Sequence, residues 1–484
     1  MKKRVLPFVS EHHDPLFHPD VYQKMDEEDS LTKNRKGFNI PQNSNVVANL
    51  KEVHKGVSEN SMYSLENHLS MNEMVYFTGH SLGLQPKTYS KYLNQELEDW
   101  KLMGVDGHFN AKTPWVDYHK SLTKSTAKLV GAKEEEVVTM NGLSVNLHLL
   151  LTSFYNPTKK KYKILCEPNL FPSDLYILQS QIKLKGFDPL SSLIFLPTSQ
   201  DGVVLESTLH ELIDLNKNEL ALIFLGGVNY YTGQVFDIEK ITKHAHDHDI
   251  MVGFDLAHAV GNIELNLHHW NVDFAAWCSY KYLNSGPGNV STIFIHKSNI
   301  KKSVFRLAGW WGHESKSRFS IQKEFNPINT AEGWQLSNAP VLGMSIYRVS
   351  LEMFDEIGMS RLIDKRIKLS NYLEKAIRSV NDKQGLIDFK IITPGPATKR
   401  GSQLSVLITL SDLYKESHPK LWKSSDSIAK NIYNELIYFG FCVDWRDPNI
   451  IRIAPVPMYN TFEDVARFYD VLLNMVYRYD VFEE

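Results

Sequence analysis

Between about residues 75 and 300, short apolar runs alternate with amphipathic stretches, and this alternation limits the fold more than any other feature of the chain. The apolar runs are nearly continuous, which is typical of strands that are buried on both faces. Between them, the stretches 205–217 and 237–249 have helical spacing. The pattern predicts an α/β architecture, with a mainly parallel sheet sandwiched by helices. The predicted strands are 161–167, 220–228, 250–255, 273–279 and 291–296.

The pattern changes after about residue 345, where long helical stretches dominate. One stretch covers 341–379, and another, 424–440, has a Ser/Asp start and a glycine at its end. The last predicted helix, 461–479, opens with Thr461 and Asp464 in capping-box spacing and carries apolar side chains on one face. These elements predict a smaller α+β domain. Its predicted strands are 389–393, 404–410 and 450–457.

A chain of 484 residues is too long for one small core, so we expect more than one domain. Residues 1–72 are polar and carry little periodicity, which indicates an arm with a few short helices. We therefore expect a large domain over 73–345 and a small C-terminal domain over 346–484.

Charge and cysteine content exclude several classes of protein. The formal net charge of −3 offers no electrostatic footprint for nucleic acid or for an anionic membrane. Three widely separated cysteines give no disulfide framework, which favours a reducing compartment. The apolar run VLPFV after MKKR is too short for a secretory signal, and no segment approaches a membrane span. We expect a cytoplasmic protein without a metal motif.

The segment 250–288 carries the strongest chemical signal. One predicted strand ends on Asp255 and the next ends on Tyr280 and Lys281. Ligands of open parallel sheets bind beyond the carboxyl ends of the strands, so both side chains should reach the same edge. Pyridoxal phosphate needs a lysine for its Schiff base and an aspartate that keeps its pyridine nitrogen protonated.

A phosphate-binding segment and a ring-binding segment also precede this pair. MNGLSVNLHLL (140–150) opens an amphipathic run with small residues, so Leu143 and Ser144 can offer backbone N–H groups and a hydroxyl. FPSD (171–174) follows another predicted strand, with Phe171 suited to ring stacking and Ser173 or Asp174 suited to polar contact.

Each piece alone has an ordinary structural explanation. An aspartate that ends a strand is more often a turn or helix cap than a cofactor ligand. A lysine after a strand is usually solvated, and a lone His258 is more often a satisfied polar residue than a catalyst. Together, in this order on an α/β pattern, Asp255 and Lys281 favour a pyridoxal-phosphate enzyme of the aspartate-aminotransferase fold type.

The chain also resembles the kynureninase family in its eukaryotic form, from about Asp26 to about residue 478. The resemblance is carried by motifs that occur in family order: TGHSLGLQPK, MNGLSVNLHLL, KYKILCEPNLFPSD, YYTGQ, DLAHAVGN, WCSYKYLNSGPG, GWWGHE and RIAPVPMYN. It implies the type I fold of pyridoxal-phosphate enzymes and a homodimer with active sites at the subunit interface. The implied reaction is hydrolysis of kynurenine or 3-hydroxykynurenine to L-alanine plus anthranilate or 3-hydroxyanthranilate, with the hydroxylated substrate preferred.

The resemblance implies a role for each matching residue. Lys281 would be the Schiff-base lysine, Asp255 the pyridinium partner and Tyr280 a candidate proton donor. Arg452 would bind the substrate α-carboxylate; it lies in an apolar strand, where an unpaired guanidinium would be costly. The remaining cofactor positions are Leu143, Ser144, Phe171, Pro172, Ser173, Asp174, Gly226, His258, Tyr280, Trp310 and Asn338. The positions near the aryl ring of the substrate are His108, Ser337 and Asn338.

Three positions depart from the family pattern. His80 stands in GHSLG where asparagine is expected, and Gln335 replaces an arginine. Gly226 occupies a cofactor position where a serine hydroxyl commonly binds the phosphate.

Two other functions stay open. One is a cysteine desulfurase or aminotransferase of the same fold, although no cysteine lies in an obvious glycine-rich loop. The other is an inactive cofactor-binding scaffold, against which the presence of Asp255, Lys281 and Arg452 argues.

Overall fold

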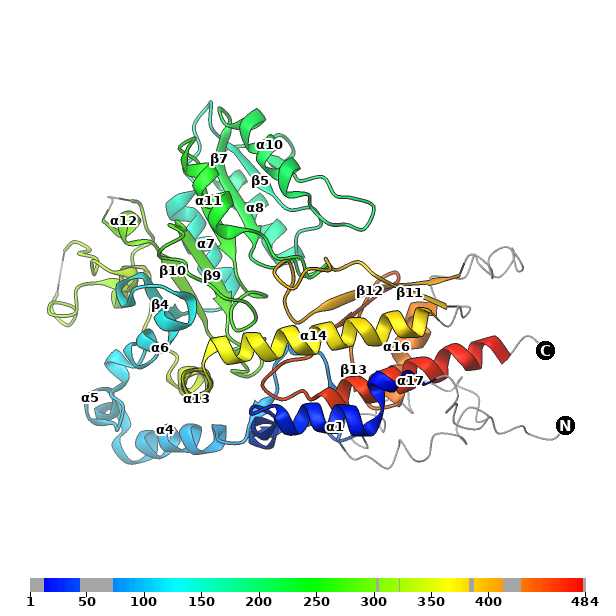
Figure 1. Cartoon of the computed structure of the whole chain (residues 1–484). Helices are drawn as coiled ribbons and strands as arrows, with labels where there is room; N and C mark the ends of the chain where they lie inside the picture. Colours follow the sequence, from blue (N-terminus) through cyan, green and yellow to red (C-terminus); the bar gives the residue numbers. More distant parts are fainter. Residues whose placement is uncertain are drawn as a thin grey trace. The chain divides into compact units, whose positions relative to one another are not determined.

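The computed structural model describes residues 13–43, 73–301, 304–321, 323–382, 387–411 and 428–481. The chain forms two compact units (Figure 1). Unit 1 contains Met1–Gln85, Tyr231–Gly233 and Leu362–Glu484, and unit 2 contains Pro86–Tyr230 and Gln234–Arg361. Among the described residues, no helix combines the length and the apolar character that a membrane span requires.

Unit 2 is built on a seven-stranded sheet with the strand order β4-β10-β9-β8-β7-β5-β6. The five strands predicted from apolar runs all form, because each run supplies side chains to both covered faces. The strands are β4 (Val137–Met140), β5 (Lys163–Cys166), β6 (Leu193–Phe195), β7 (Leu220–Gly226), β8 (Met251–Asp255), β9 (Phe274–Cys278) and β10 (Ser291–Ile295).

The sheet is mainly parallel, as predicted, but one of the predicted strands runs the other way. Strands β6, β5, β7, β8 and β9 are parallel to one another. Strand β10 is antiparallel to both of its neighbours, and Ser291 pairs with Cys278 on one side and with Met140 on the other. A strand buried on both faces has the same apolar pattern in either direction, so the sequence could not reveal this reversal.

Helices cover both faces of this sheet. One face packs against α7 (Leu143–Phe154) and α8 (Pro172–Leu184), whose apolar side chains form one core with alternate residues of the strands. The other face is covered by α6 (Lys120–Val130), α11 (Ile238–His246) and α13 (Val341–Ile357) (Figure 1). The remaining helices of unit 2 are α4 (Tyr89–Met103), α5 (Gly107–Asn110), α9 (Pro189–Ser192), α10 (Glu206–Asn216) and α12 (Lys297–Ile300).

Unit 1 has its own core around a four-stranded antiparallel sheet of order β11-β12-β15-β14. Its strands are β11 (Ile387–Ile391), β12 (Leu404–Leu410), β14 (Asp444–Arg446) and β15 (Ile450–Ile453). Strand β2 (Val75–Tyr76) pairs in parallel with β13 (Phe441–Cys442), so residues near both ends of the chain share this unit. The helices are α1 (Pro19–Glu28), α14 (Met359–Asn381), α16 (Ile428–Tyr438) and α17 (Phe462–Val481).

The predicted final helix forms with its capping box in place. The backbone N–H of Asp464 donates to Thr461 Oγ1, and the N–H of Thr461 donates to Asp464 Oδ2, both at 3.2 Å. Its apolar face is buried in the core of unit 1 and contains Val465, Phe468, Leu472 and Met475.

The single helical stretch predicted over 341–379 is two helices. They are separated at Gly358, whose φ of 85° lies in the left-handed region and ends α13. Residues 424–427 of the predicted helix 424–440 lie outside the described residues, and α16 begins at Ile428.

Candidate active site

Four parallel strands of unit 2 end at one edge of the sheet and bring polar groups together there. Strand β5 is followed by Glu167, β7 ends on Gly226, β8 ends on Asp255, and β9 is followed by Tyr280 and Lys281 after one serine. The register places Gly226 opposite Asp255. The edge is therefore the one expected for a ligand site in a parallel sheet.

Asp255 forms a turn cap and a carboxyl pair at the same time. Its Oδ1 accepts a 2.8 Å hydrogen bond from the backbone N–H of Ala257, as the ordinary turn interpretation predicts. Its side chain is also hydrogen-bonded to Asp174 from the N-terminus of α8. Burial raises the pKa of both carboxyls, and the charge of Asp255 raises the pKa of Asp174 further. Lys281 acts in the opposite direction on both, so we assign the proton of the pair to Asp174 and the negative charge to Asp255.

Lys281 lies near both this carboxyl pair and an aromatic ring. Its Nζ is 5.9 Å from the centroid of Phe171, the residue that precedes α8. The Phe171 ring contacts Tyr230 edge-on, with the two centroids 5.3 Å apart. The structure therefore brings Lys281, Asp255, Asp174 and Phe171 into one group.

Tyr280 is half-buried, and its phenol is hydrogen-bonded to the thiol of Cys278, the last residue of β9. Burial is the main cause that raises the pKa of the Tyr280 phenol, and the nearby thiol adds to it. The phenol therefore keeps its proton at neutral pH and can donate it.

The N-termini of α7 and α8 meet at this edge of the sheet. Gly142 is the N-cap of α7, so the first free N–H groups of that helix belong to Leu143 and Ser144. Ser144 Oγ lies 2.8 Å from Ser173 Oγ in the first turn of α8, and Pro172 occupies the first position of α8. Two hydroxyls and a helix N-terminus are a suitable combination for a phosphate.

Glu167 is a buried residue of this edge that the sequence reasoning missed. Its carboxylate accepts a 3.0 Å hydrogen bond from the Gly226 N–H and a 2.5 Å hydrogen bond from the Asn229 side-chain amide. Burial raises its pKa to about 7, and the charge of Asp255 adds to the effect. Its position directly after a buried strand, as for Asp255, was the signal that could have identified it.

The glycine at position 226 is explained by this carboxylate. A Cβ atom added there would lie 2.9 Å from Glu167 Oε1 and 3.3 Å from the Val228 carbonyl oxygen. A serine at this position would therefore require Glu167 to move.

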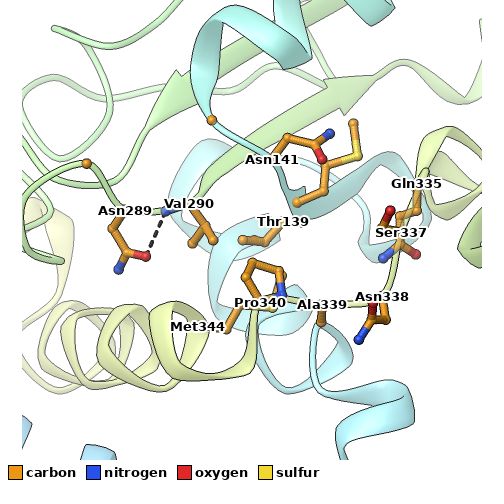
Figure 2. Close-up of a pocket in the computed structure, with 13 residues that line it drawn as sticks. Thr139, Asn141, Asn289, Val290, Gln335, Ser337, Asn338, Ala339, Pro340 and Met344 are labelled. Atoms are coloured by element: carbon orange, nitrogen blue, oxygen red, sulfur yellow. Dashed lines mark hydrogen bonds between the residues drawn. The ribbon is translucent and has the colours of Figure 1, made fainter.

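Two of the residues predicted near the aryl ring line a pocket of about 410 Å³ in unit 2. Ser337 and Asn338 lie on the segment that leads into α13, next to Gln335 and across the pocket from Asn289 (Figure 2). Asn141 and Gly142, just before α7, also line it. The pocket thus adjoins the N-terminus of the helix that carries Ser144.

Three more of the predicted residues of unit 2 lie in α5, near Arg318 and in the turn after β8. His108 belongs to α5 and contacts Trp115 edge-on at a centroid distance of 5.5 Å. Trp310 is 56% exposed, and its Nε1 donates to the Arg318 carbonyl oxygen at 2.8 Å. His258 is buried in the turn after β8, where its carbonyl oxygen accepts from the Asn262 amide at 2.9 Å.

Arg452 belongs to unit 1, where it pairs with a carboxylate inside the small sheet. It is 1% exposed in β15, and its Nε donates to Asp444 Oδ1 at 2.9 Å on the neighbouring strand β14. Burial alone would raise the pKa of Asp444, but the hydrogen bond and the charge of Arg452 lower it to about 2. This guanidinium is therefore paired inside the protein, and its burial is not evidence for a substrate carboxylate. His80, one of the departures from the family pattern, also lowers the pKa of Asp444 by its charge.

The group at the sheet edge fits the predicted cofactor. It offers a lysine amine, a carboxylate that keeps its charge, an aromatic ring next to the amine, and N–H and hydroxyl donors at a helix N-terminus. Pyridoxal phosphate needs these four kinds of group.

Comparison with protein families gives two matches. The model described as "Aminotransferase class-V" matches residues 75–410, and the one described as "Kynureninase C-terminal domain" matches residues 420–472.

Curated relatives match over most of the chain. A kynureninase of Christiangramia forsetii is 44% identical over 453 residues, which cover 93% of this chain and 96% of that protein. A kynureninase of Koribacter versatilis is 48% identical over 396 residues, which cover 81% of this chain and 88% of that protein.

Solved structures share the fold at low sequence identity. A cysteine desulfurase from Thermococcus onnurineus NA1 has a TM-score of 0.68 and 18% identity, with 86% of this chain and 96% of that chain covered. The cystine C–S lyase C-DES, solved with cysteine persulfide, has a TM-score of 0.68 and 14% identity, with 83% and 97% covered.

Proposed function

The chain belongs to the kynureninase family, and from this premise we propose that it hydrolyses the Cβ–Cγ bond of L-kynurenine and 3-hydroxy-L-kynurenine. The products are L-alanine and anthranilate or 3-hydroxyanthranilate. The protein is an enzyme that acts on a small molecule, and its cofactor is pyridoxal 5′-phosphate. The proposal rests on one observation above all: Lys281 lies beside the Asp255–Asp174 pair at the carboxyl edge of the parallel sheet.

The proposed chemistry divides between the cofactor and the chain. When bound, pyridoxal phosphate withdraws electrons from the Cα of the substrate. Asp255 stabilises positive charge at the pyridine nitrogen, and the protonated Asp174 holds the Asp255 carboxylate in place. The Lys281 amine takes the proton from Cα, since a lysine at the reacting centre is a suitable general base.

The other residues at this edge bind the cofactor and supply the second proton. Leu143, Ser144 and Ser173 hold the phosphate through N–H groups and hydroxyls, a proposal supported by the 2.8 Å contact between the two serines. Phe171 stacks on the ring. Tyr280 gives its phenolic proton to the β-carbon after the Cβ–Cγ bond breaks, a role supported by its place directly before Lys281, since a phenol is protonated at neutral pH. Further proposed contacts to the cofactor are Pro172, Gly226, His258, Trp310 and Asn338.

Substrate recognition is proposed for Arg452, His108, Ser337 and Asn338. Arg452 binds the α-carboxylate, because a planar guanidinium already oriented by Asp444 is suited to bidentate binding. Ser337 and Asn338, with His108, recognise the aryl ring. Their polar groups can bond the 3-hydroxyl, which supports 3-hydroxy-L-kynurenine as the preferred substrate.

We place the enzyme in the cytoplasm as a homodimer with active sites at the subunit interface, in tryptophan catabolism and pyridine nucleotide synthesis. The dimer is supported by large apolar side chains that are exposed close to Trp310. The Phe319 ring lies 5.6 Å from Trp310 and 5.9 Å from Phe109, and all three are more than half exposed.

The test is to incubate the holoenzyme with each substrate and to follow the aryl product and alanine. We expect equal amounts of both products, with a higher kcat/KM for the 3-hydroxy substrate and no turnover by Lys281→Ala. Alanine without aryl product would indicate different chemistry. A lysine–cofactor adduct that borohydride reduces, together with no turnover, would indicate an inactive cofactor-binding scaffold.

The cysteine desulfurase alternative is weakened by the thiols themselves. Burial raises the pKa of Cys166 and Cys278, and it raises that of Cys442 to about 12. Persulfide chemistry needs a thiolate, which these environments disfavour.

A further inference from the structure

Helix α10, helix α11 and the turn after α11 carry a cluster of histidines and one aspartate, and this turn precedes the start of β8, whose other end carries Asp255. Asp214 lies near the end of α10, His244 lies in the last turn of α11, and His248 lies in the turn that follows. The two helices are neighbours on the outside of unit 2 (Figure 1). We propose that Asp214, His244 and His248 form a binding site for a divalent zinc-type ion, which joins α10 to the end of α11.

The donor atoms already converge as the ligands of such an ion do. Asp214 Oδ1 lies 3.1 Å from His244 Nε2 and 3.0 Å from His248 Nε2. In a tetrahedral zinc site with bond lengths of about 2.0–2.2 Å, the ligand atoms lie about 3.3 Å apart. All three ligand atoms lie within 4.8 Å of one another, so movement of the side chains alone can bring them to the separations of such a site.

A fourth side chain, that of His210, is hydrogen-bonded to the proposed ligand His244. His210 lies one turn before Asp214 on α10, and its Nδ1 is 2.6 Å from His244 Nδ1. When Nε2 of His244 binds an ion, its Nδ1 carries the proton and donates it to His210. Zinc-binding histidines commonly use their second nitrogen in this way.

The ligand types and their exposure also suit a zinc-type ion. Two imidazoles and one carboxylate are common zinc ligands, and late first-row divalent ions prefer imidazole. The side chain of Asp214 is 55% exposed, and those of His244 and His248 are 22% and 23% exposed. An ion can therefore reach the site and keep a water molecule as its fourth ligand.

The described residues contain a second group of two histidines and a carboxylate, but its carboxylate is already hydrogen-bonded within the protein. Glu136, directly before β4, lies near His268 and His296. Its two oxygens accept backbone N–H groups of Lys297 and Lys133 at 2.9 Å, and His268 Nδ1 lies 2.8 Å from Oε1. Glu136 therefore serves as a structural hub, and we propose no ion there.

The experiment measures bound Zn²⁺ per chain after the holoenzyme has been treated with a chelator and then equilibrated with micromolar ZnCl₂. We expect the His244→Ala/His248→Ala double variant to bind one equivalent fewer than the wild type. Co²⁺ should give the visible absorption of a four-coordinate site in the wild type and not in the double variant. Since neither histidine belongs to the proposed active site, turnover of the double variant should stay at the wild-type level, which also shows that it is folded.

The matched control is His246→Ala on the same helix. His246 Nε2 lies 2.9 Å from Asp273 and is not part of the cluster, so this variant should bind as much Zn²⁺ as the wild type. Equal Zn²⁺ content in the double variant and the wild type would overturn the proposal. So would binding only at millimolar Zn²⁺, since an adventitious ion behaves in that way.

Discussion

Tyr280 is the side chain whose proposed role depends most on a single atom. Replacing it with phenylalanine removes the phenolic proton and leaves the ring. We expect kcat of Tyr280→Phe to fall by about 10²–10⁴, the usual contribution of a positioned acid, while pyridoxal phosphate still binds. The measurement is steady-state turnover together with a cofactor titration.

Tyr282 provides the matched control for Tyr280. It lies two residues further along and is buried in the core, with 2% of its surface exposed. Tyr282→Phe should keep near wild-type turnover. Full turnover by Tyr280→Phe would remove the proposed proton donor.

Glu167, again a single residue, is expected to make the stability of the protein depend on pH. Its pKa is about 7 in the folded protein against an ordinary 4.5, so the unfolded chain releases this proton first. Stability therefore falls as pH rises from about 4.5 to 7, and Glu167→Gln removes that fall. We expect the difference in free energy of unfolding, variant minus wild type, to rise by about 2–3 kcal/mol between about pH 5 and 8. Chemical denaturation of the cofactor-free proteins measures it, and a difference that is flat with pH would contradict the assignment.

At the scale of elements, the pair of strands β14 and β15 depends on a buried ion pair. Asp444→Asn removes the charge that pairs with the Arg452 guanidinium, whose side chain is 1% exposed. We expect a loss of about 3 kcal/mol or more in the free energy of unfolding and a raised KM, because the guanidinium loses its orientation.

The same ion pair makes stability depend on pH. Since the pKa of Asp444 is lowered to about 2 from 3.8, its contribution to the free energy of unfolding is complete above about pH 4 and is lost as pH falls towards 2.

Arg446→Gln is the control for this ion pair. Arg446 also bonds Asp444, with Nε to Oδ1 at 2.8 Å, but its side chain is 36% exposed. Solvent screens such a pair, so the loss should stay below about 1 kcal/mol. If Asp444→Asn and Arg446→Gln lost equal free energy of unfolding, the burial of Arg452 would not be the cause of the loss in Asp444→Asn.

At the scale of the whole molecule, the exposed aromatic group around Trp310 should decide assembly. We expect Phe319→Glu to shift the enzyme from dimer to monomer in sedimentation experiments and to lower turnover at the same time. Leu190→Glu is the control, because this leucine is 93% exposed on α9, a separate element of the unit. A monomeric Phe319→Glu protein with full activity would contradict active sites at the interface.

Much of the fold of this protein follows from local patterns alone. Continuous apolar runs produced five strands, and helical spacing produced α10, α11 and α17, because burial and periodicity act within one segment. The order Asp255 then Lys281 was enough to bring both to one edge, since parallel neighbours carry their carboxyl ends to the same side. The break at Gly358 and the reversal of β10 were missed, because neither alters the apolar pattern that predicts the element.

The sequence by itself determined the α/β architecture, the strand-end positions of Asp255 and Lys281, and, through its motifs, the kynureninase family. Only the tertiary structure decided the partners of the buried charges: Asp174 for Asp255, Gly226 and Asn229 for Glu167, and Asp444 for Arg452. It alone brought Asp214 to His244 and His248. Strand order, register and helix packing select which distant side chains meet. The residues next to a charged side chain in the sequence determine none of these three, so they cannot identify its partner.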